Sequence, residues 1–582
     1  MKILLTTLNA KYVHTSLGLW YIYQYCRNDY PELIFEEFNI NQDLGWILGE
    51  IYSRHAAIVA FSCNIWNIGS ILILCQRLKE VAPGTTIVLG GPEVWSEPAA
   101  IMNQHPAVDF IVVGEGELTF KDWLYQVSQS SPDWAAVAGL VYRKGDQIMI
   151  NPPRPPLQDL SVLPFPYPSN LSDFRQKLVY YETARGCPYH CEYCLSANET
   201  GVRFFPLERV KQDLLRLIKA GIAQVKLVDR SFNCNPHWAK QLWRFLIEHA
   251  KVTNFHFEIV GDQLDDESLA ILQQAPSGLF QFEIGVQSFN PKTLAAISRK
   301  MDIACLQKRV TQLVTTTKVF VHLDLIAGLP YEDYSSFART FDTALALRPH
   351  RLQLGFLKLL RGSSLRDKAL AYGYKFTREA PYEVLANPWL SYAEMLKLKG
   401  IEDLLERYYN SGRFKQTLQY LFYRTTSPFA WFERFSSWWK EQGFDALAHK
   451  NKDLYGYLLQ FLKASRQWTA AEIEIFINLL KFDLLSQERM VELPDWAGSN
   501  DTGLKSFGFE FWKDPANRQR FFPDSPDLQA REIQRRTLWA HFAIDPLQVA
   551  KVAGDELVWA GAVYLFIYGK EGVKSYQIVT EG

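Results

Sequence analysis

The feature that most constrains the fold of this chain is a repeated alternation of short apolar runs with helical patterns. In the first 130 residues, the apolar runs cover residues 2–6, 57–62, 86–91 and 110–116, and each ends in small or polar residues. Buried parallel strands end in this way where they deliver loops to a ligand crevice. The stretches between them carry helical spacing. We therefore predict a doubly wound, Rossmann-like α/β domain whose ligand lies at the carboxyl ends of the strands.

A proline-rich segment separates this pattern from a second one. Seven prolines lie between Pro152 and Pro168, so the segment can hold neither a helix nor a central strand and is typical of a stiff linker. A protein-binding proline motif is the weaker alternative, because no repeated spacing occurs. Six further strands are predicted, at residues 178–184, 223–229, 254–260, 279–286, 318–326 and 351–357. Six strand–helix units form a partial TIM-like barrel, (β/α)6, since a complete barrel has eight.

The remaining third of the chain is predicted to be mainly α-helical. After Gly362 the pattern changes to long amphipathic helices, and the chain ends in a predicted β-hairpin with strands at 563–568 and 573–579. The fold class is thus α/β with a helical C-terminal domain. The expected domains are a Rossmann-like domain at 1–135, a linker at 136–175, the partial barrel at 176–360 and the C-terminal domain at 361–582.

Composition and charge exclude several classes of protein. The 582 residues carry a formal net charge of −1, which gives no global case for binding nucleic acid or an acidic membrane, although a local basic patch stays compatible with it. No apolar run approaches the roughly 18–20 residues that span a bilayer, and the first residues lack the length and cleavage site of a secretory signal. Five cysteines are scattered without a paired spacing: Cys26, Cys63, Cys75, Cys234 and Cys305. We therefore expect a protein of the reducing cytoplasm without a disulfide framework.

The other three cysteines, Cys187, Cys191 and Cys194, crowd into the decapeptide R-G-C-P-Y-H-C-E-Y-C at 185–194. Thiolates bind zinc or iron–sulfur clusters. A structural zinc site needs four ligands, but His190 is adjacent to Cys191, so the two side chains tend to diverge, and Cys234 is the nearest other thiol. A redox pair is less favoured, because no C-x-x-C opens a helix after a thioredoxin-like strand. A cluster held by only three cysteines would leave one iron open at the mouth of the barrel.

This loop resembles the cluster-binding loop of radical S-adenosylmethionine (SAM) enzymes, where SAM chelates the open iron of a 4Fe-4S cluster and releases a 5′-deoxyadenosyl radical after reduction. Four further stretches are similar to the coproporphyrinogen-oxidase-like and Elongator-like branch of that family. They are F-H-F-E-I-V (255–260), F-E-I-G-V-Q-S-F-N (282–290), I-S-R-K (297–300) and L-D-L-I-A-G-L-P (323–330).

The resemblance implies roles in SAM binding for several residues at strand ends. Tyr193 would stack near the adenine, and Glu258 would accept bonds from the ribose hydroxyls. Gln287 would contact the methionyl portion, and Arg299 would pair with its carboxylate. Asp324 and Glu283 would lie near the ribose and adenine. Taken singly, each would more often be a helix cap or a surface salt bridge, and their order behind the cysteine loop favours the SAM roles.

One element departs from the family pattern. V-D-R-S-F-N (228–233) stands where a glycine-rich element is expected near the second barrel strand. We expect Asp229 and Asn233 to shape the contact to the SAM amino group there.

The first domain also resembles a known domain. G-G-P-E-V (90–94) and V-V-G-E-G-E-L-T-F (112–120) are similar to the cobalamin-binding-like domain that precedes many radical SAM domains. The resemblance implies a cobalamin contact for the glycine-rich turns Gly90, Gly91, Gly114, Glu115 and Gly116. Two alternatives stay open: the glycines only make tight turns, or the fold persists without the cofactor. No D-x-H-x-x-G occurs, and His14 is not expected to replace it, so cobalamin would bind without a histidine ligand.

The sequence therefore predicts an oxygen-sensitive radical SAM enzyme with 4Fe-4S, SAM and cobalamin, which acts on an unknown substrate and transfers a methyl group to an unactivated carbon. A flavodoxin or ferredoxin would supply electrons. P-Y-E-V-L-A-N-P-W-L-S (381–391) and Y-Y-N-S-G-R-F (408–414) resemble a C-terminal domain of unknown function.

Two alternatives to this function remain. One is an RNA-modifying methylthiotransferase-like enzyme with a second cluster on Cys26, Cys63 and Cys75. The other is a non-catalytic zinc-stabilised scaffold whose Trp438 and Trp439, near Arg434 and Lys440, stack on bases.

Overall fold

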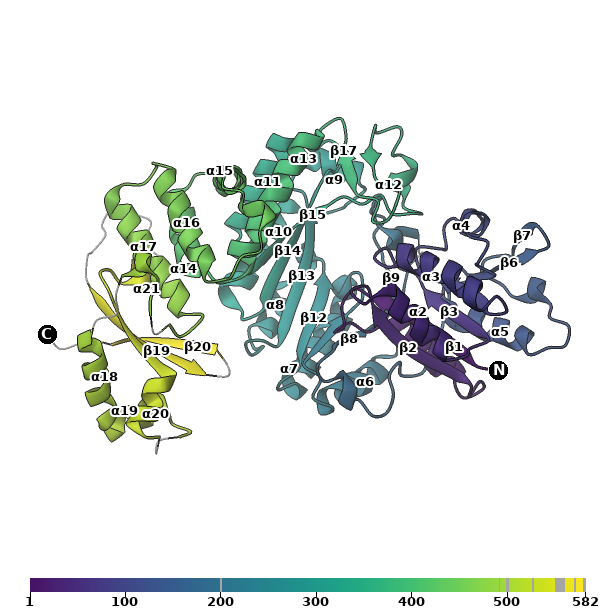
Figure 1. The fold of residues 1–582 in the computed structure, drawn as a ribbon, viewed down its shortest axis with the longest axis horizontal. Coiled ribbons are helices and arrows are strands. Elements are labelled where there is room, and N and C mark those ends of the chain that lie inside the picture. The colour runs from purple at the N-terminus through teal and green to yellow at the C-terminus, as the bar shows by residue number, and fades with distance from the viewer. Residues whose placement is uncertain are drawn as a thin grey trace. The chain divides into compact units, whose positions relative to one another are not determined.

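A computed structural model describes residues 1–198, 201–490, 492–498, 502–525, 528–549, 561–569 and 572–578 (Figure 1). The chain forms two compact units, Met1–Met395 and Leu396–Gly582. The first unit contains both α/β patterns and extends beyond residue 360, where the barrel domain was expected to end. The reason is a segment that returns to the barrel, since Tyr374 and Asn387 both donate hydrogen bonds to the carbonyl of Gly328 at 3.0 and 2.8 Å.

The N-terminal domain is built on a seven-stranded sheet with the order β2-β1-β3-β4-β5-β6-β7. Its strands are β1 (Ile3–Asn9), β2 (Leu33–Asn39), β3 (Ile58–Ser62), β4 (Thr86–Gly90), β5 (Phe110–Val112), β6 (Leu140–Lys144) and β7 (Gln147–Ile150). The first five are parallel. β1, β3, β4 and β5 lie in the predicted apolar runs, whereas β2, which Glu36 and Glu37 interrupt, has no counterpart among the expected strands.

The hairpin of β6 and β7 changes the expected position of the linker. Both strands are antiparallel additions to the first sheet, yet they fall within residues 136–175. Leu140 and Val141 are buried, and Gly145 makes the turn with a φ of 61°. The proline-rich connection therefore begins only after Ile150.

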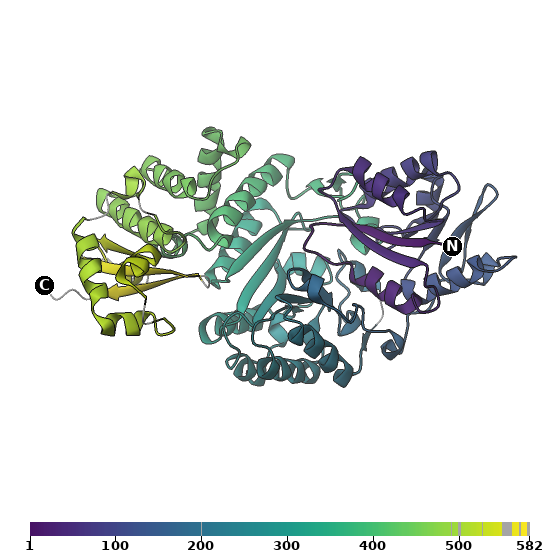
Figure 2. The same cartoon turned by 60° about the horizontal axis from the view of Figure 1, so that its bottom comes forward.

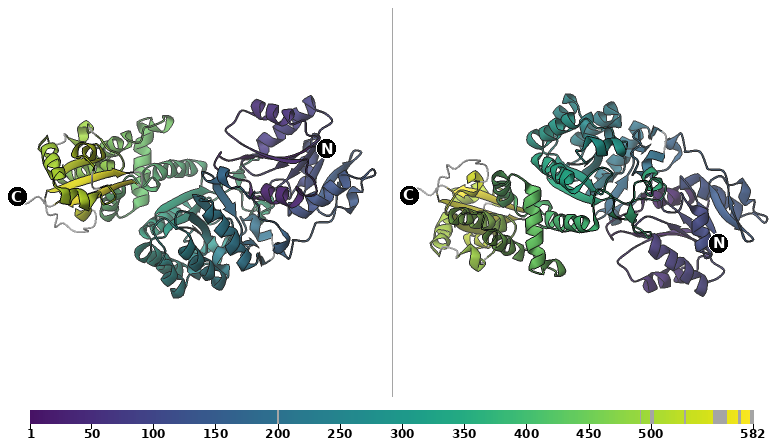
Figure 3. Two further views of the ribbon diagram at one scale, coloured as in Figure 1. Left: turned by 90° about the horizontal axis from the view of Figure 1, so that it is seen from below. Right: turned by 90° about the horizontal axis from the view of Figure 1, so that it is seen from above.

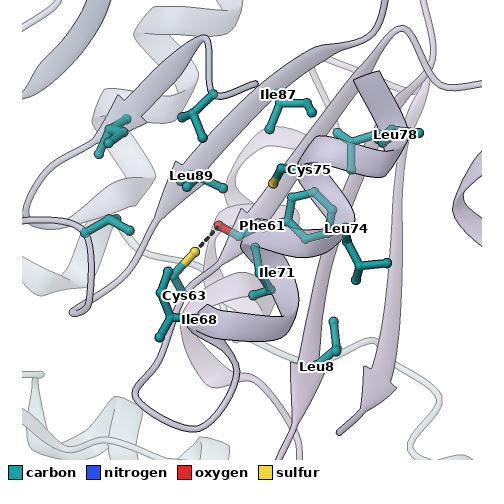
Figure 4. Packing of buried hydrophobic residues seen from close by; sticks show 14 of the residues in the cluster. Leu8, Phe61, Cys63, Ile68, Ile71, Leu74, Cys75, Leu78, Ile87 and Leu89 are labelled. Carbon is teal, nitrogen blue, oxygen red and sulfur yellow. Dashed lines mark hydrogen bonds between the residues drawn. The ribbon is translucent and has the colours of Figure 1, made fainter. Parts of the chain in front are cut away.

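Helices cover both faces of this sheet (Figure 2). One buried cluster joins the strands to α2 (Leu44–Ser53), α3 (Ile68–Val81) and α4 (Pro98–Gln104). A second cluster, on the opposite face, involves α1 (Leu17–Cys26) and α5 (Gly116–Val127). Figure 4 shows the first cluster, where Leu74 and Leu78 of α3 lie near Phe61 and Ile87 of the strands. The predicted doubly wound domain is confirmed.

The second sheet is a parallel six-stranded partial barrel with the order β15-β14-β13-β12-β11-β8, as predicted. Its strands are β8 (Leu178–Tyr181), β11 (Gln224–Leu227), β12 (Asn254–Ile259), β13 (Phe280–Gln287), β14 (Phe320–Ala327) and β15 (Arg351–Phe356). The helices between them, seen outside the sheet in Figure 3, are α6 (Leu207–Lys219), α7 (Pro236–His249), α8 (Asp266–Leu272), α9 (Pro291–Ala296), α10 (Ile303–Thr316) and α11 (Tyr334–Ala346).

The two faces of the barrel sheet differ in chemistry. Side chains alternate along a strand, and one face carries buried apolar residues such as Phe257 and Phe282, the latter 5.5 Å by ring centroids from Trp243 of α7. The other face is the barrel lumen. It carries polar residues at corresponding positions of neighbouring strands: Lys226, His256, Glu258, Glu283, His322 and Asp324.

Five short elements complete the first unit. β9 (Ala184–Gly186) pairs with β10 (Val202–Phe204), and after the barrel come α12 (Ser364–Asp367), β16 (Lys375–Phe376) and β17 (Val384–Ala386).

The second unit contains mainly helices and one small sheet. Its helices are α13 (Tyr392–Leu404), which begins in the first unit, α14 (Lys415–Arg424), α15 (Pro428–Glu441), α16 (Asp453–Ala464), α17 (Ala470–Leu485), α18 (Thr502–Lys513), α19 (Pro515–Phe521), α20 (Ala530–Arg536) and α21 (Pro546–Val549). β19 (Ala562–Gly569) and β20 (Gly572–Ile578) form the predicted hairpin, to which β18 (Thr537–Phe542) adds a third strand. No helix among the described residues has both the length and the apolarity to cross a membrane.

Candidate active site

One large cavity, of about 820 Å³, lies between the N-terminal domain and the barrel. The first domain contributes the ends of β1, β3, β4 and β5, and the barrel contributes residues of β8, β11 and β12. Parallel α/β sheets bind ligands at the carboxyl ends of their strands, and here the ends of two such sheets border the same space. Leu195 and Ser196, directly after Cys194, also line the cavity.

Glycines form part of the wall of this cavity on the side of the first domain. Gly90, Gly91, Gly114 and Gly116 all line it, together with Glu115. Gly91 has a φ of 101°, and a Cβ there would lie 2.6 Å from the carbonyl oxygen of Cys63. A side chain is thus excluded by strain and by contact. The backbone itself is presented to the cavity, which suits a large ligand that needs close approach.

Glu115 is held by cations from the barrel rather than being free. Its carboxylate lies 2.8 Å from Arg203 and 3.5 Å from Arg185, and it accepts a hydrogen bond from the Leu157 amide at 2.7 Å. Against the effect of burial, these groups hold the pKa of Glu115 below its ordinary value. Glu115 therefore ties the glycine-rich turn to the barrel, and it also lines the cavity.

The cysteine loop starts directly after β9, and the pairing of β9 with β10 closes it at its base. Cys187 and Cys191 are buried and Cys194 is half-buried. The Cys194 amide donates to the carbonyl of Cys191 at 3.0 Å, which gives the C-E-Y-C turn. Burial raises the pKa of Cys191, and the neighbouring Arg299 guanidinium, 3.7 Å from its sulfur, opposes that shift. Three thiols with a cation beside them suit a cluster whose thiolates need neutralisation.

Arg299 and Tyr193 lie together beside this loop. Arg299 donates to the Tyr193 hydroxyl at 3.3 Å and to the carbonyl of Gly285, while its Nε has no hydrogen-bond partner. Gln287 sits at a bulge of β13 with a φ of 69°, and its buried Oε1 also lacks a partner. Buried polar atoms without partners are costly unless a ligand completes them, and these two belong to residues expected to contact SAM.

The lumen carries a ladder of charges around Lys226, a residue that sequence reasoning missed. Lys226 Nζ lies 3.4 Å from Glu258 and 3.0 Å from Glu283, and His256 Nε2 lies 2.8 Å from Glu283. Against burial, His256 and Lys226 hold the pKa of Glu283 well below its usual range. The alternation in Q-V-K-L places Lys226 on the lumen face, but only the strand register shows its partners.

Asp324 lies deeper in the same lumen. Its Oδ1 is 2.8 Å from His322 Nε2, and burial raises the pKa of Asp324 to about 6. Glu283, His322 and Asp324 converge closely enough to hold a cation. The carboxylate of Glu283 is already paired with Lys226 and in contact with His256, however, so it is engaged within the protein.

Asp229 and Asn233 are fully engaged with the backbone. Asp229 accepts hydrogen bonds from the Thr183 amide at 3.0 Å and its hydroxyl at 2.6 Å, and burial raises the pKa of Asp229 to about 7. The Asn233 amide bonds both the N–H and the carbonyl of Val260, at 2.8 and 2.9 Å. Both residues thus join the ends of neighbouring barrel strands.

The positions of the other cysteines argue against a second cluster. Cys63 and Cys75 lie in the buried apolar cluster of Figure 4, whereas Cys26 belongs to the cluster on the opposite face of the sheet. Three thiols on two sides of a sheet cannot ligate one cluster. His190, the loop residue considered as a further zinc ligand, is exposed.

The tryptophans proposed for base stacking are part of a helical core. Trp439 is buried, and Trp438 packs on Phe435 and Phe461 with ring centroids 6.1 and 5.6 Å away. An aromatic core explains them without nucleic acid.

Two further cavity residues, His14 and Tyr180, were not among the predicted site residues. His14, on the loop after β1, faces Tyr180 of β8 with its Nδ1 2.7 Å from the hydroxyl. Burial lowers the pKa of His14. The only sequence signal was its place on an early loop, since its partner is set by the packing of the two sheets.

Three protein families match successive parts of the chain. Residues 3–124 match the B12 binding domain, residues 181–344 the Radical SAM superfamily, and residues 370–557 a family described as Protein of unknown function (DUF4080). The chain therefore carries a region that matches the B12 binding domain, followed by a region that matches the Radical SAM superfamily. The resemblance inferred from the motifs is confirmed.

Curated relatives include methyltransferases. The chain is 28% identical, over 48% of its length, to 2-(S-pantetheinyl)-carbapenam-3-carboxylate methyltransferase of Streptantibioticus cattleyicolor. It is 26% identical, over 56% of its length, to the cobalamin-dependent radical SAM methyltransferase TokK of Streptomyces tokunonensis. The chain spans 43% and 50% of these two proteins, about half of their length.

Solved structures share the fold. The radical SAM methyltransferase TsrM from Kitasatospora setae, with cobalamin and a [4Fe-4S] cluster bound, matches with a TM-score of 0.54 at 17% identity, over 66% of this chain and 80% of that chain. The cobalamin-dependent SAM radical enzyme OxsB, with aqua-cobalamin and SAM bound, matches with a TM-score of 0.55 at 13% identity, over 82% and 78%.

Proposed function

We propose that this chain is a cobalamin-dependent radical SAM enzyme that passes a methyl group from SAM to a carbon of its substrate. The observation that carries this proposal is the single cavity bordered by the glycine turns of the B12-binding domain and by strands β8, β11 and β12 of the radical SAM domain. Cofactors held at these two walls would face one space. The methyltransferases among the relatives support the same reaction class.

Specific residues would hold the cofactors. The thiolates of Cys187, Cys191 and Cys194 suit three irons of a 4Fe-4S cluster and leave the fourth for SAM. Beside that loop, the Arg299 Nε lacks an acceptor and the Gln287 Oε1 lacks a donor, so a ligand with both a carboxylate and an amino group would complete them. When bound, the cluster supplies an electron to SAM, and cobalamin supplies a carrier for the methyl group.

The proposal also includes an electron donor, a cellular compartment and a substrate. The cluster must be reduced from outside, and a flavodoxin or ferredoxin is the proposed donor. Eight cysteines without a disulfide suit the reducing cytoplasm. The substrate is a small molecule or other compound that reaches the cavity, and nothing in the cavity wall favours nucleic acid.

Anaerobic purification and metal analysis test this function. We expect a brown protein with iron, sulfide and cobalt, which yields 5′-deoxyadenosine or S-adenosylhomocysteine after reduction in the presence of SAM. The matched control is Cys305→Ala, outside the loop, which should retain all three elements. Zinc without iron or sulfide would instead support a scaffold and sink the proposal. Comparison of metabolites with and without the protein would then search for the substrate.

A further inference from the structure

Residues 359–384, which follow the last barrel strand, form a closed loop that we call the strap. Its two ends pair with each other: the Leu359 amide donates to the carbonyl of Tyr382 at 3.0 Å, and the Val384 amide donates to that of Leu357 at 2.9 Å. Tyr374, inside the strap, is anchored on the barrel through Gly328. The strap is therefore a defined piece of structure with a fixed base.

One side of the strap contacts the glycine-rich loop of the first domain. Tyr382 donates its hydroxyl proton to Glu93 at 2.8 Å and accepts a hydrogen bond from Arg361 at 2.9 Å. Arg361 also lies 3.2 Å from Glu97. Tyr382 and Glu93 are each only 2% exposed, and burial raises the pKa of Glu93. Tyr382 is the only hydrogen-bond donor to the Glu93 carboxylate among the described residues, and a buried acid that loses its donor is costly.

The other side of the strap contacts the cysteine loop at Glu192, the residue between Cys191 and Tyr193. The Leu365 amide donates to the Glu192 carbonyl at 2.8 Å, and Lys368 Nζ lies 2.7 and 2.6 Å from its two carboxylate oxygens. Asn198, at the end of the loop, donates to the carbonyl of Gly362 at 2.8 Å.

We propose that the strap is a positioning element that holds the cysteine loop in a fixed relation to the glycine loop at residues 90–97. The inference rests on the proposed function for the identity of the two cofactors, but the contacts do not depend on it. Tyr382 and Lys368 are positioning residues. They act through Glu93 and Glu192, whose loops bear the ligands. The first part of the DUF4080 match, from residue 370 to the end of the strap, thus belongs to the first unit and contacts the glycine loop through Tyr382.

Two substitutions in the full-length, reconstituted protein test the strap. Tyr382→Phe removes only the hydroxyl, and Lys368→Met removes only the charge. We expect amide hydrogen exchange to rise about tenfold, in residues 90–97 for the first variant and in residues 187–198 for the second. The distribution of cobalt-to-cluster distances, measured by pulsed EPR, should broaden in both variants while iron and cobalt contents stay at the wild-type level.

Matched controls and a rescue keep the test decisive. Lys375→Met, an exposed lysine within the strap, and Tyr392→Phe, an exposed tyrosine just beyond it, should leave both loops unchanged. The double variant Lys368→Glu with Glu192→Lys swaps the two charges and should restore slow amide hydrogen exchange in residues 187–198. If Tyr382→Phe does not fold, this double variant tests the strap. Wild-type exchange in both loops of both variants would overturn the strap. Absence of iron and cobalt from the wild-type protein would instead overturn the proposed function, with the exchange result still reporting on the strap.

Discussion

The two sheets of the first unit border the same cavity with different chemical groups. The first-domain sheet is apolar on both faces and meets the cavity through glycine turns, where Gly91 excludes any side chain. The barrel sheet is apolar only toward its helices. Its lumen carries Lys226, Glu258 and Glu283 in direct ion pairs.

This difference indicates two modes of recognition. A wall of backbone selects a ligand by shape and close approach, which suits a large planar cofactor. A wall of paired charges fixes polar groups in place and controls their protonation, which suits SAM. Substitutions should therefore act through packing in the first domain and through charge in the barrel.

The largest expected effect comes from the cysteine loop. Cys191→Ala removes one of three thiolates, and we expect iron and sulfide to fall to background and SAM cleavage to be lost, because a cluster cannot be held by two ligands. Elemental analysis and chromatography of the products measure this. Cys75→Ala, in the apolar cluster of the first domain, should keep the cluster. Full iron content in Cys191→Ala would remove this residue from the ligand set.

The buried carboxylate of Asp229 gives a pH-dependent effect of the next size. Its folded pKa of about 7 lies above the value near 3.9 of an unfolded aspartate. The carboxyl therefore stays protonated up to a higher pH in the folded protein than in the unfolded chain. The stability of the wild type should therefore fall as the pH rises from about 4 to about 7, by up to about 4 kcal/mol, and stay level above that. Urea titrations of Asp229→Asn should lack this slope. An equal slope in both proteins would assign the pH dependence to other groups.

The fold was largely predictable because it depends on local patterns. The six barrel strands and the four inner strands of the first sheet appear as apolar runs, whose burial needs no knowledge of distant residues. β2 did not appear as an apolar run, since an edge strand tolerates Glu36 and Glu37. The hairpin of β6 and β7 was not predicted, because the prolines that follow it led to the assignment of the whole segment as a linker.

The candidate site was predictable only for residues that belong to a recognisable sequence motif. The cysteines and Glu258 stand in such motifs, but Lys226, Arg185 and His14 acquire partners through strand register and domain packing. Arg185, for example, meets Glu117 at 2.6 Å across 68 positions of sequence. A charge on one strand gives no sign of a partner that far away.

Lys226→Met tests the charged wall and should cost about 3 kcal/mol at pH 8. It leaves Glu258 and Glu283 without their shared cation in a half-buried lumen. The loss should shrink toward pH 5, because the pKa of Glu283 rises without Lys226 and its carboxylate then takes up a proton more readily. Lys211→Met, which removes an ion pair on the outside of α6, should stay within about 0.5 kcal/mol. A pH-independent loss would point to packing rather than charge.

Gly91→Ala tests the backbone wall, with the smallest expected effect on stability. A positive φ and a Cβ at 2.6 Å from Cys63 should cost about 1–3 kcal/mol and weaken cobalamin binding, measured by absorbance titration. Gly49→Ala, inside α2 with open space around it, should be neutral or stabilising by about 0.5–1 kcal/mol. Unchanged cobalamin affinity in Gly91→Ala would place the ligand elsewhere.

The central claim is that both walls present their cofactors to one cavity. The most direct test is anaerobic incubation of the reduced, cobalamin-loaded protein with SAM that carries a deuterated methyl group, followed by mass spectrometry. We predict trideuterated methylcobalamin and an equal amount of S-adenosylhomocysteine. A protein that binds both cofactors fully and yet leaves cobalamin unlabelled would contradict the account.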